Sequence, residues 1–474
     1  MVVGELTVEC DLLVVGGGPG GYVAAIRAAQ LGLDVVLVED TFIGGVCLNV
    51  GCIPSKALIT VANRVDQVRH SKDMGIVVGS VEVDFPQLMT YKSQVVSRLT
   101  SGVSQLLDGN GISVIEGRAT FVSANLARVQ LEHEVQQVRF KSAILATGSR
   151  PFELPSIPFD HHVVVDSTDA LSFESIPERL VIVGGGYIGL EIGTAYRKLG
   201  SNVTVIEATD QLLGTMDSSL VSVVVRRLKT LGVEVHLSCT VTDVVISGLT
   251  ATVKFQKGDS TESLDADKVV VAVGRIPNSE DLGLEHLGVK LNSKGFVEVD
   301  EQRRSSVSSI FAIGDVAGGE LLAHKASFEG KVAATVAAGI KDAYDPLAVP
   351  AVVFTDPEIA TVGLTLKEAE RLGYNATSSR FPFAGIGRAV SMNETEGFCQ
   401  VVYDKDSGVI LGLHLVGPDA SDLLGEASVL VEFGANLEDL GRTIHAHPTL
   451  AEIFMEVAEA ALGLPVHQLP KKIR

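Results

Sequence analysis

The sequence predicts an α/β protein with two Rossmann-like dinucleotide-binding domains followed by a C-terminal α+β domain. Three observations support this fold class: a repeated plan of strand, glycine turn, helix and strand, the chain length, and strands that precede helices near the C-terminal end. At 474 residues, the chain should form three or four compact units rather than one. Its 46% hydrophobic residues and 48 glycines are typical of a globular protein with many tight turns.

An internal repeat organises the first half of the chain. In the first copy, the apolar run Leu12–Val15 leads into GGGPGG, an alanine-rich helical stretch and a second strand that ends at Glu39. Residues 180–207 repeat this plan with LVIVGGGYIG, a helix and VTVIE, which ends at Glu207. The first glycine and the acid are 23 residues apart in both copies. Each glycine motif follows a strand and opens a helix, which is the context that dinucleotide binding requires.

The glycines of each fingerprint meet different physical demands. The first makes a tight turn, the second lets the backbone approach a pyrophosphate, and the third lets the helix pack closely on the strand. The pyrophosphate would lie at a helix N-terminus, where free N–H groups and the helix dipole favour anions. The acid would bind a ribose hydroxyl pair. The alternative is a pair of glycine-rich turns in a nucleotide-free sheet. The residues concerned are Gly16, Gly18, Gly21 and Glu39 in the first copy and Gly184, Gly186, Gly189 and Glu207 in the second.

Later glycine turns suggest where the domains begin and end. Ile144–Pro151 (ILATGSRP) and Val269–Asn278 (VVVAVGRIPN) are each an apolar strand stopped by a glycine turn and a proline, as at the edges of an inserted domain. FAIGDV is a strand that ends in Gly-Asp, where a carboxylate could meet a cofactor hydroxyl. From about Val349, strands such as QVVYD and VILGLHLVG precede a helical C-terminus. We therefore expect four segments: 1–150, the first part of one dinucleotide-binding domain; 151–276, the second such domain; 277–348, which completes the first site; and 349–474, a C-terminal α+β domain.

Charge and hydropathy restrict the possible partners. The net charge of −20 comes from 58 acidic and 38 basic residues, and no basic run resembles a nucleic-acid footprint. The acidity suits either a soluble surface or a face for a basic docking partner. Met1–Asp11 lacks the features of a signal peptide, and no stretch reaches the roughly 18 uncharged apolar residues of a membrane span. We expect a cytoplasmic protein with no nucleic-acid partner and no membrane span.

Two of the five cysteines lie close together. In GGVCLNVGCIPSKAL, Cys47 and Cys52 are five residues apart, which on an ideal helix separates them by about 140° and roughly 7.5 Å along the axis. Disulfide geometry requires Cα atoms closer than about 6.8 Å, so we expect a distorted segment near Gly45 and Gly51. In a reducing compartment such a pair suggests redox chemistry. Zinc binding and two structural thiols are the alternatives, but no second ligand pair at zinc spacing exists, and no metal is expected.

These motifs together resemble the flavin disulfide reductases, most closely the dihydrolipoamide dehydrogenases. The redox segment, both fingerprints, ATG, the Gly-Asp motif and HPTLAE occur in the same order over essentially the whole chain. The resemblance implies FAD at the first fingerprint, NAD at the second, and a homodimer formed through the C-terminal domain. Its implied partner is a lipoyl-bearing acyltransferase, or the H-protein, of a multienzyme complex. Further implied contacts are Lys56, Ala119, Thr147, Gly148, Asp315, Leu321, Ala323 and His324 for FAD and Tyr187, Val241 and Gly274 for NAD.

The resemblance also assigns roles around the cysteines. Cys47 is expected to exchange with the substrate, and Cys52 to lie under the flavin and pass electrons to it. Lys56 is expected to pair with Glu191 near the reactive flavin nitrogen. A lysine beside an anionic reduced flavin gives electrostatic stabilisation, and a buried lysine needs an acid partner. Without the flanking motifs, Lys56 would be interpreted as a helix lysine whose charged end reaches solvent.

HAHPTLAE supplies the expected base. His447 and Glu452 match the family's catalytic histidine and its orienting carboxylate. Thiol–disulfide exchange needs a deprotonated thiol, and imidazole titrates near working pH. A carboxylate on the other ring nitrogen fixes the tautomer and stabilises the imidazolium. His445 is the nearest rival.

The expected reaction is oxidation of protein-bound dihydrolipoamide with NAD⁺, and Tyr187 is expected to swing aside for the nicotinamide. Related mercuric reductases carry a C-terminal cysteine pair that PVHQLPKKIR lacks, and soluble transhydrogenases lack one of the two redox cysteines. Glutathione reductases place arginines after the second strand, where this chain has Glu207 followed by Ala208, Thr209 and Asp210. Glu207 would repel a 2′-phosphate, which favours NAD over NADP. A hypothesis of another class is a scaffold subunit whose flavin is only structural.

Overall fold

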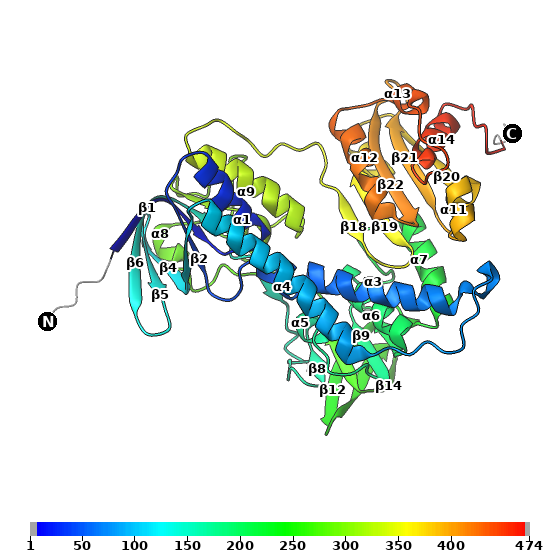
Figure 1. Cartoon of the computed structure of the whole chain (residues 1–474), viewed down its shortest axis with the longest axis horizontal. Coiled ribbons are helices and arrows are strands. Elements are labelled where there is room, and N and C mark those ends of the chain that lie inside the picture. The colour runs from blue at the N-terminus through cyan, green and yellow to red at the C-terminus, as the bar shows by residue number, and fades with distance from the viewer. Residues whose placement is uncertain (1–6, 470–474) are drawn as a thin grey trace.

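The structure is a computed structural model that describes residues 7–469, so the first part of Met1–Asp11 and the last five residues lie outside it. Figure 1 shows an N-terminal lobe, a second lobe below it and a C-terminal lobe beside both. The chain builds the N-terminal lobe, passes into the second lobe, returns to the first and ends in the third, as the colours show. The fold class expected from the sequence is confirmed.

The N-terminal lobe contains a mixed seven-stranded sheet. Its parallel part has the order β3-β2-β1-β6-β17, and the first half of β6 also continues into the antiparallel strands β5 and β4. Helices α1 and α9 pack against one another beside this sheet (Figure 1). The elements are β1 Thr7–Val15, α1 Pro19–Gln30, β2 Val35–Glu39, β3 Ser113–Glu116, β4 Arg118–Ser123, β5 Leu126–Gln130, β6 Val135–Leu145, α8 Leu284–Leu287, β17 Ile310–Ala312, the 3₁₀ turn η2 Gly314–Ala317 and α9 Ala323–Ala337.

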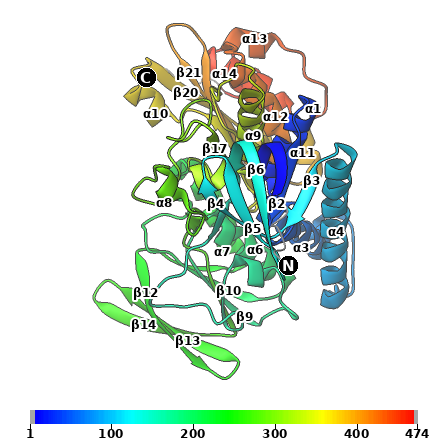
Figure 2. The ribbon, with the colours of Figure 1, turned by 90° about the vertical axis from the view of Figure 1, so that its left-hand side faces the viewer.

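The second lobe repeats the parallel sheet and adds an antiparallel one. Its strands follow the order β11-β10-β9-β15-β8, all parallel, and β12, β13 and β14 form a three-stranded sheet at the bottom of Figure 2. The elements are β8 Val164–Val165, α5 Ser167–Ala170, β9 Arg179–Val183, α6 Tyr187–Leu199, β10 Asn202–Ile206, α7 Ser218–Leu231, β11 Glu234–His236, β12 Cys239–Ser247, β13 Thr250–Lys257, β14 Ser260–Ala266 and β15 Lys268–Val271.

The two strands that connect these lobes pair with each other. β7 (Ser149–Pro151) leads into the second lobe and β16 (Arg275–Pro277) leads back, and they form an antiparallel ribbon with Ile276 opposite Arg150. Each follows a glycine with positive φ, Gly148 at 71° and Gly274 at 136°. The two strand–glycine–proline segments of the sequence therefore lie where the chain enters and leaves the second lobe.

The C-terminal lobe is an antiparallel sheet with helices packed on it. The strand order is β18-β19-β22-β21-β20, and the core lies between this sheet and helices α12, α13 and α14. The elements are β18 Ala351–Val353, β19 Glu358–Gly363, α10 Leu366–Arg371, β20 Ala376–Pro382, η3 Phe383–Gly385, α11 Gly387–Met392, β21 Phe398–Asp404, β22 Ile410–Gly417, α12 Ala420–Glu432, α13 Leu437–Arg442 and α14 Glu452–Ala461.

One helical region joins the three lobes. α2 (Gly45–Asn49) and α3 (Cys52–Arg69) follow the first fingerprint, η1 (Ser71–Met74) ends α3, and α4 (Phe85–Gly109) packs beside it. α3 also packs along α6, as Figure 1 shows. Among residues 7–469, the stretch Gly45–Arg69 is the one helical segment long and apolar enough to cross a membrane. Because it is interrupted at Gly51 and packs on α4 and α6, we interpret it as an internal helix of the protein.

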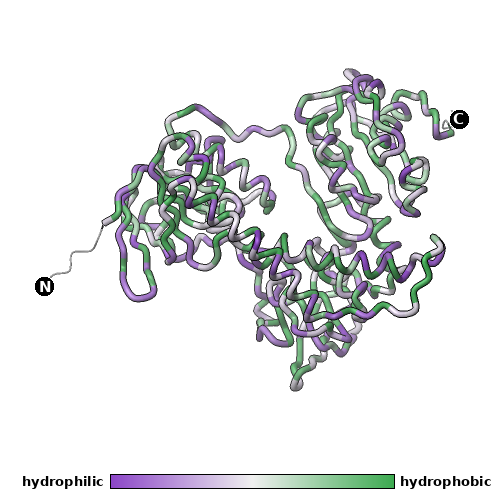
Figure 3. Tube along the Cα trace, viewed as in Figure 1, coloured by the Kyte–Doolittle hydropathy of each residue, from purple (hydrophilic) through white to green (hydrophobic). Residues whose placement is uncertain are grey.

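Apolar packing explains why these elements stay together. Hydrophobic stretches run through all three lobes (Figure 3). The parallel strands are covered on both faces, which is why runs such as Leu12–Val14 are continuous and fully buried. The largest apolar cluster is shared between lobes, because it combines Leu58 of α3, Phe85 of α4, Tyr196 of α6 and Val353 of β18.

A buried ion cluster fixes the turn after β17. Glu329 is fully buried, and its Oε1 atom lies 2.9 Å from both Arg303 Nη1 and Lys325 Nζ. Its Oε2 atom accepts a 2.7 Å hydrogen bond from the backbone N–H of Gly314. A carboxylate in this position compensates part of the charge of two cations and orients the backbone that leads into Asp315.

We predict that Glu329→Gln lowers the free energy of unfolding by roughly 3 kcal/mol, because breaking a buried ion cluster leaves the remaining charges uncompensated. Thermal unfolding followed by circular dichroism should show a fall of several degrees in Tm. The control is Asp281→Asn, which removes an exposed partner of Arg118 and should hardly change Tm. Equal Tm values for the two variants would contradict a structural role for the cluster.

Candidate active site

One cavity of about 750 Å³ brings together residues from the first fingerprint, the redox segment, α6 and η2. It is lined by fourteen of the residues expected from the sequence: Gly16, Gly18, Glu39, Cys47, Cys52, Lys56, Ala119, Thr147, Gly148, Tyr187, Glu191, Asp315, Leu321 and Ala323.

The other expected residues lie outside this cavity. Gly21 lies behind the first fingerprint, in α1. His324 lies at the start of α9 and its Nε2 atom is 2.7 Å from the carbonyl oxygen of Pro350. Val241 is buried in the core of the second lobe. The second fingerprint, with Gly184, Gly186, Gly189 and Glu207, forms a separate turn there, Gly274 precedes β16, and His447 and Glu452 are in the C-terminal lobe.

The two fingerprints have matching backbone geometry. Gly16 has φ of 105° and Gly184 has φ of 106°, which a side chain would strain. A Cβ atom on Gly21 would lie 1.8 Å from the Gly16 carbonyl oxygen, and one on Gly189 would lie 2.4 Å from that of Gly184. These glycines thus permit the turn and the close helix–strand contact.

Each fingerprint is closed by its acid. Gly17 donates its N–H to Glu39 Oε2 at 2.6 Å, and Gly185 donates to Glu207 Oε2 at the same distance. The other carboxylate oxygen accepts from the backbone after the strand, at Thr41 and Phe42 in the first copy and at Thr209 in the second. These bonds hold each carboxylate beside its glycine turn, with lone pairs left for ribose hydroxyls.

The residues present fit two dinucleotides. Gly18 and Gly186 are the N-caps of α1 and α6, and neither helix has a side-chain cap, so backbone N–H groups remain for a pyrophosphate. A Cβ atom on Gly186 would meet nothing within 4 Å, and one on Gly18 would meet only Gly45 at 3.9 Å. There is room for a phosphate to approach both turns.

The redox segment is broken as expected. α2 ends at Asn49 and α3 begins at Cys52, with Gly51 between them at φ −137° and ψ −107°. A Cβ atom at Gly51 would lie 2.9 Å from the carbonyl oxygen of Val46. The break brings the two cysteines together as free thiols within hydrogen-bonding contact.

The two thiols differ in acidity. A hydrogen bond from Cys47 and the positive charge of Lys56 lower the pKa of Cys52 to about 7, against the effect of burial. The hydrogen bond to Cys52 and burial raise the pKa of Cys47. Cys52 also lies at the first residue of α3, where the helix dipole favours a thiolate. Cys52 is therefore the cysteine that carries negative charge in the reduced pair.

A buried acid, itself held by a backbone N–H, binds Lys56. Lys56 Nζ lies 2.7 Å from Glu191 Oε2, and Glu191 is only 4% exposed. Glu191 Oε1 accepts from the N–H of Phe354 at 2.9 Å, and the Lys56 ammonium lies 4.5 Å from the centre of the Phe354 ring. Phe354 was not expected from the sequence, because nothing in VVFTDPE marks a backbone donor for a residue 163 positions earlier.

A second chain of contacts reaches Asp315. Ser149 Oγ donates to Asp315 Oδ2 at 2.5 Å, and Arg275 Nε donates to Ser149 Oγ at 2.7 Å. Arg275 therefore connects the ribbon between the lobes to the carboxylate in the cavity. Ser149 and Arg275 were also missed by sequence analysis, although both lie in the segments GSRP and GRIP that it identified. Tyr187 lies nearby, and desolvation raises its pKa to about 12, so its phenol stays protonated.

His447 and Glu452 form the expected pair. His447 Nδ1 lies 2.9 Å from Glu452 Oε1, and the His447 side chain is 76% exposed. Burial favours protonation of Glu452, but hydrogen bonds from the Thr449 N–H and the His447 ring hold its pKa below the usual value. Within residues 7–469, no partner is found for Nε2 of His447.

The side chain of His445, the rival histidine, is 5% exposed, and both of its ring nitrogens have partners. Its Nε2 atom lies 2.8 Å from Glu426 Oε1 and its Nδ1 atom lies 3.0 Å from the Thr443 carbonyl oxygen. Both ring nitrogens face acceptors, so the ring offers no lone pair to a substrate. Among the described residues, His447 is thus the histidine of this motif that keeps a ring nitrogen without a partner.

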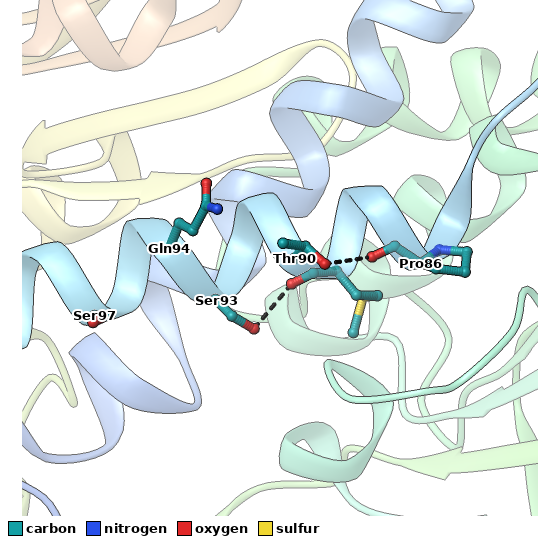
Figure 4. Close-up of a pocket in the computed structure, with 6 residues that line it drawn as sticks. Pro86, Thr90, Ser93, Gln94 and Ser97 are labelled. Carbon is teal, nitrogen blue, oxygen red and sulfur yellow. Dashed lines mark hydrogen bonds between the residues drawn. The ribbon is translucent and has the colours of Figure 1, made fainter.

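Other features of the described chain show no comparable chemistry. A shallow hollow on α4 is lined by Pro86, Met89, Thr90, Ser93, Gln94 and Ser97. In Figure 4, the hydroxyls of Thr90 and Ser93 bond to carbonyl oxygens of their own helix. Between residues 7 and 469, no group of three or more His, Cys, Asp or Glu side chains could hold a metal ion. Cys10, Cys239 and Cys399 are each buried in apolar clusters.

Comparison with known families gives full-length matches. The family model for pyridine nucleotide-disulphide oxidoreductases matches residues 10–330, and the model for their dimerisation domain matches residues 349–458. The chain is 49% identical to a dihydrolipoyl dehydrogenase of Geobacillus stearothermophilus, over 99% of this chain and 100% of that protein. It is 46% identical to that of Haloferax volcanii, over 99% and 100%.

Solved structures share the arrangement. LpdA from Mycobacterium tuberculosis aligns with a TM-score of 0.89 at 26% identity, covering 95% of this chain and 99% of that one. The HOCl-induced flavoprotein disulfide reductase RclA from Escherichia coli aligns with a TM-score of 0.84 at 27% identity and the same coverage. The similarity therefore extends over all three lobes.

The second fingerprint generates a matched pair of predictions. Gly189→Ala should lower Tm, because its Cβ atom would lie 2.4 Å from the Gly184 carbonyl oxygen. Gly186→Ala should keep Tm within about 1 °C, since its Cβ atom meets nothing and φ is −75°, but it should weaken NAD⁺ binding at least tenfold by blocking the pyrophosphate. Calorimetry would measure both quantities. Unchanged NAD⁺ affinity in Gly186→Ala would exclude this turn as the pyrophosphate site.

Proposed function

The chain belongs to the pyridine nucleotide-disulphide oxidoreductase family, and from this membership we propose that it oxidises dihydrolipoamide to lipoamide while reducing NAD⁺. The observation that carries the proposal is the Cys47–Cys52 pair, which shares one cavity with the first fingerprint and the Lys56–Glu191 ion pair. Its full-length similarity to proteins named dihydrolipoyl dehydrogenase supports the choice of substrate.

FAD would be held by the first fingerprint and NAD⁺ by the second. Glu39 would bind the FAD ribose, while Asp315, fixed by Ser149 and the Glu329 cluster, would bind a hydroxyl further along the cofactor. Tyr187 at the cavity and Glu207 at the second turn would contact the nicotinamide dinucleotide. FAD supplies an acceptor for the electron pair of the reduced cysteines and a hydride donor to NAD⁺.

The cysteines and the base carry the exchange. In the oxidised enzyme, Cys47 and Cys52 are joined, and one thiolate of dihydrolipoamide attacks Cys47 Sγ. The disulfide breaks and Cys52 leaves as a thiolate, which Lys56 stabilises. His447 takes the proton of the second substrate thiol, whose sulfur then displaces Cys47 and closes the lipoyl disulfide. Cys47 takes up this proton from His447, and the two electrons of the substrate remain on the cysteine pair.

We assign His447 to the active site of the second subunit. His447 is not among the residues that line the cavity with Cys47, and α13 and α14, which flank it in sequence, lie at the far end of the C-terminal lobe from α3 in Figures 1 and 2. The match to a dimerisation domain over residues 349–458 supports a homodimer in which each base serves the other chain.

The remaining assignments follow the same proposal. Residues 1–150 and 277–348 form the FAD-binding part, 151–276 the NAD-binding domain and 349–474 the dimerisation domain. The physiological partner is a lipoyl-bearing acyltransferase of a 2-oxoacid dehydrogenase complex or the H-protein of glycine cleavage, in the cytoplasm. The reducing conditions there suit a dithiol that must cycle between two states.

Cysteine variants test the function. Cys47→Ser and Cys52→Ser should each abolish NADH formation from dihydrolipoamide, because both sulfurs are needed for exchange. Cys10→Ala, Cys239→Ala and Cys399→Ala should keep kcat within about twofold, since these residues are in apolar cores away from the cavity. NADH absorbance gives the rates. Turnover in either redox variant would disprove a dithiol mechanism and favour a structural flavin.

Co-refolding tests the shared site. Cys47→Ser and His447→Gln homodimers should both be inactive, but a mixed dimer has one site with both defects and one with neither. About half of randomly assorted dimers are mixed, so activity should return to roughly a quarter of wild type. Subunit exchange would be verified by native mass spectrometry. Recovery near zero with exchange verified would show that His447 serves its own chain.

A further inference from the structure

Two polar pairs join α3 and α6, seven residues apart on both helices. Lys56 of α3 bonds Glu191 of α6, and Asn63 of α3 bonds Lys198 of α6 through a 2.7 Å hydrogen bond from Lys198 Nζ. We call these pairs the upper and lower rungs. Seven residues are about two helical turns, or roughly 10.5 Å. The helices are therefore in a fixed register, with the upper rung beside Cys52 and the lower rung two turns away.

A single segment of the C-terminal lobe contacts both rungs. It lies between β18 and β19, whose hairpin approaches α3 in Figure 1. At one end the Phe354 N–H donates to Glu191 Oε1 at 2.9 Å. Two residues later, Asp356 Oδ2 lies 2.7 Å from Lys198 Nζ. The backbone between Phe354 and Asp356 can extend only about 7 Å. A segment that contacts both rungs therefore has little freedom to move relative to either.

Lys198 of the lower rung also belongs to a larger ion cluster. The Lys198 side chain is 3% exposed. Arg227 of α7 donates to Asp356 Oδ2 from Nε at 2.9 Å, and its Nη2 atom lies 2.8 Å from Asp66 Oδ2 of α3. Two cations and two carboxylates thus balance at the junction of α3, α6, α7 and the β18–β19 connection. Removal of Asp356 would leave two cations facing one carboxylate, which favours rearrangement.

We propose that Asp356 and Lys198 are positioning residues for the redox centre: the lower rung holds the β18–β19 connection so that Phe354 N–H, Glu191 and Lys56 keep their places beside Cys52. This inference rests on the proposed function, because Cys52 must act as the thiolate that Lys56 stabilises. Neither Asp356 nor Lys198 lines the cavity, so their influence passes through Phe354 and Glu191.

Loss of the lower rung has a defined effect on Cys52. The groups that face this thiol are Cys47 of α2, Lys56 of its own helix, and Glu191 and Tyr187 of α6. If the Phe354 N–H leaves Glu191, both carboxylate oxygens become available to Lys56, and the ammonium is drawn away from Cys52. The Cys52 thiolate then loses stabilisation and its pKa rises. The direct electrostatic effect of losing the Asp356 charge is the opposite, because removal of a negative charge lowers the pKa of Cys52. The direction of the pKa shift therefore distinguishes displacement of Lys56 from the direct effect of the lost charge.

The experiment titrates Cys52 directly. In the Cys47→Ser holoenzyme, the remaining thiolate beside oxidised FAD should give a long-wavelength absorption band whose intensity follows the thiolate fraction. The band is measured against pH in this background and after adding Asp356→Asn. We expect the midpoint to rise by about 0.5 to 1 pH unit. This rise corresponds to a threefold to tenfold smaller ratio of thiolate to thiol at a given pH. Asp356→Glu, which restores a carboxylate, should bring the midpoint back toward that of the background.

Two further variants complete the design. Lys198→Met leaves Asp356 paired with Arg227, so it should raise the midpoint by less than Asp356→Asn. Because loss of the Lys198 charge through space would also raise the midpoint, the rise supports the positioning role only where it exceeds that of Arg380→Met, which loses the same charge. This comparison decides the question if Asp356→Asn fails to fold or to bind FAD. Arg380→Met is the matched control, because Arg380 Nη2 bonds Ser219 Oγ across the same two lobes at 2.6 Å without touching either rung. It should leave the midpoint unchanged.

The outcomes separate this inference from the proposed function. Absence of the band at every pH in Cys47→Ser itself would overturn the assignment of Cys52, and the inference with it. A band whose midpoint is unmoved, or lowered, in folded Asp356→Asn and Lys198→Met would overturn the positioning role alone. An equal rise in Arg380→Met would also overturn it, since general loosening of the lobes would then explain the shift.

Discussion

The redox segment and the first fingerprint can share a cavity because their backbones touch. Gly45 has φ of 58°, and a Cβ atom there would lie 2.6 Å from Gly18 Cα, the N-cap of α1. Any side chain at Gly45 would push α2 away from the turn that is shaped for a pyrophosphate. With the contact in place, the break at Gly51 then sets Cys52 at the start of α3, where Lys56 and the helix N-terminus favour its thiolate. The chemistry of the pair depends on this close approach.

The site also explains why the lobes must pack together. Lys56 belongs to α3, Glu191 to the second lobe and Phe354 to the connection into the C-terminal lobe. Asp315 is fixed by Ser149 and Arg275, which lie on the two strands that link the first and second lobes. An apolar cluster shared by α3, α4, α6 and β18 supports the Lys56–Glu191–Phe354 arrangement. Relative movement of any lobe would therefore change the surroundings of Cys52 or of Asp315.

The sequence predicts the features that depend on local geometry. The glycine turns at Gly16 and Gly184 follow from demands that only glycine meets, and the break near Gly51 follows from the spacing of Cys47 and Cys52 on a helix. It could not predict Phe354, Ser149 or Asp356, because their roles arise from packing between segments far apart in the chain and one of them acts through a backbone N–H. The choice between His445 and His447 rested on motif position alone, and the contacts of both His445 nitrogens now give it a physical reason.

In the proposed reaction, electrons from dihydrolipoamide pass to the cysteine pair, then to FAD and then to NAD⁺. Anaerobic stopped-flow mixing of the oxidised holoenzyme with dihydrolipoamide, without NAD⁺, tests it most directly. The account predicts that a long-wavelength band appears while the FAD absorption remains largely oxidised, and that added NAD⁺ then removes the band and forms about one NADH per FAD. Bleaching of FAD with no preceding band, or a band that persists after NAD⁺ is added, would contradict it.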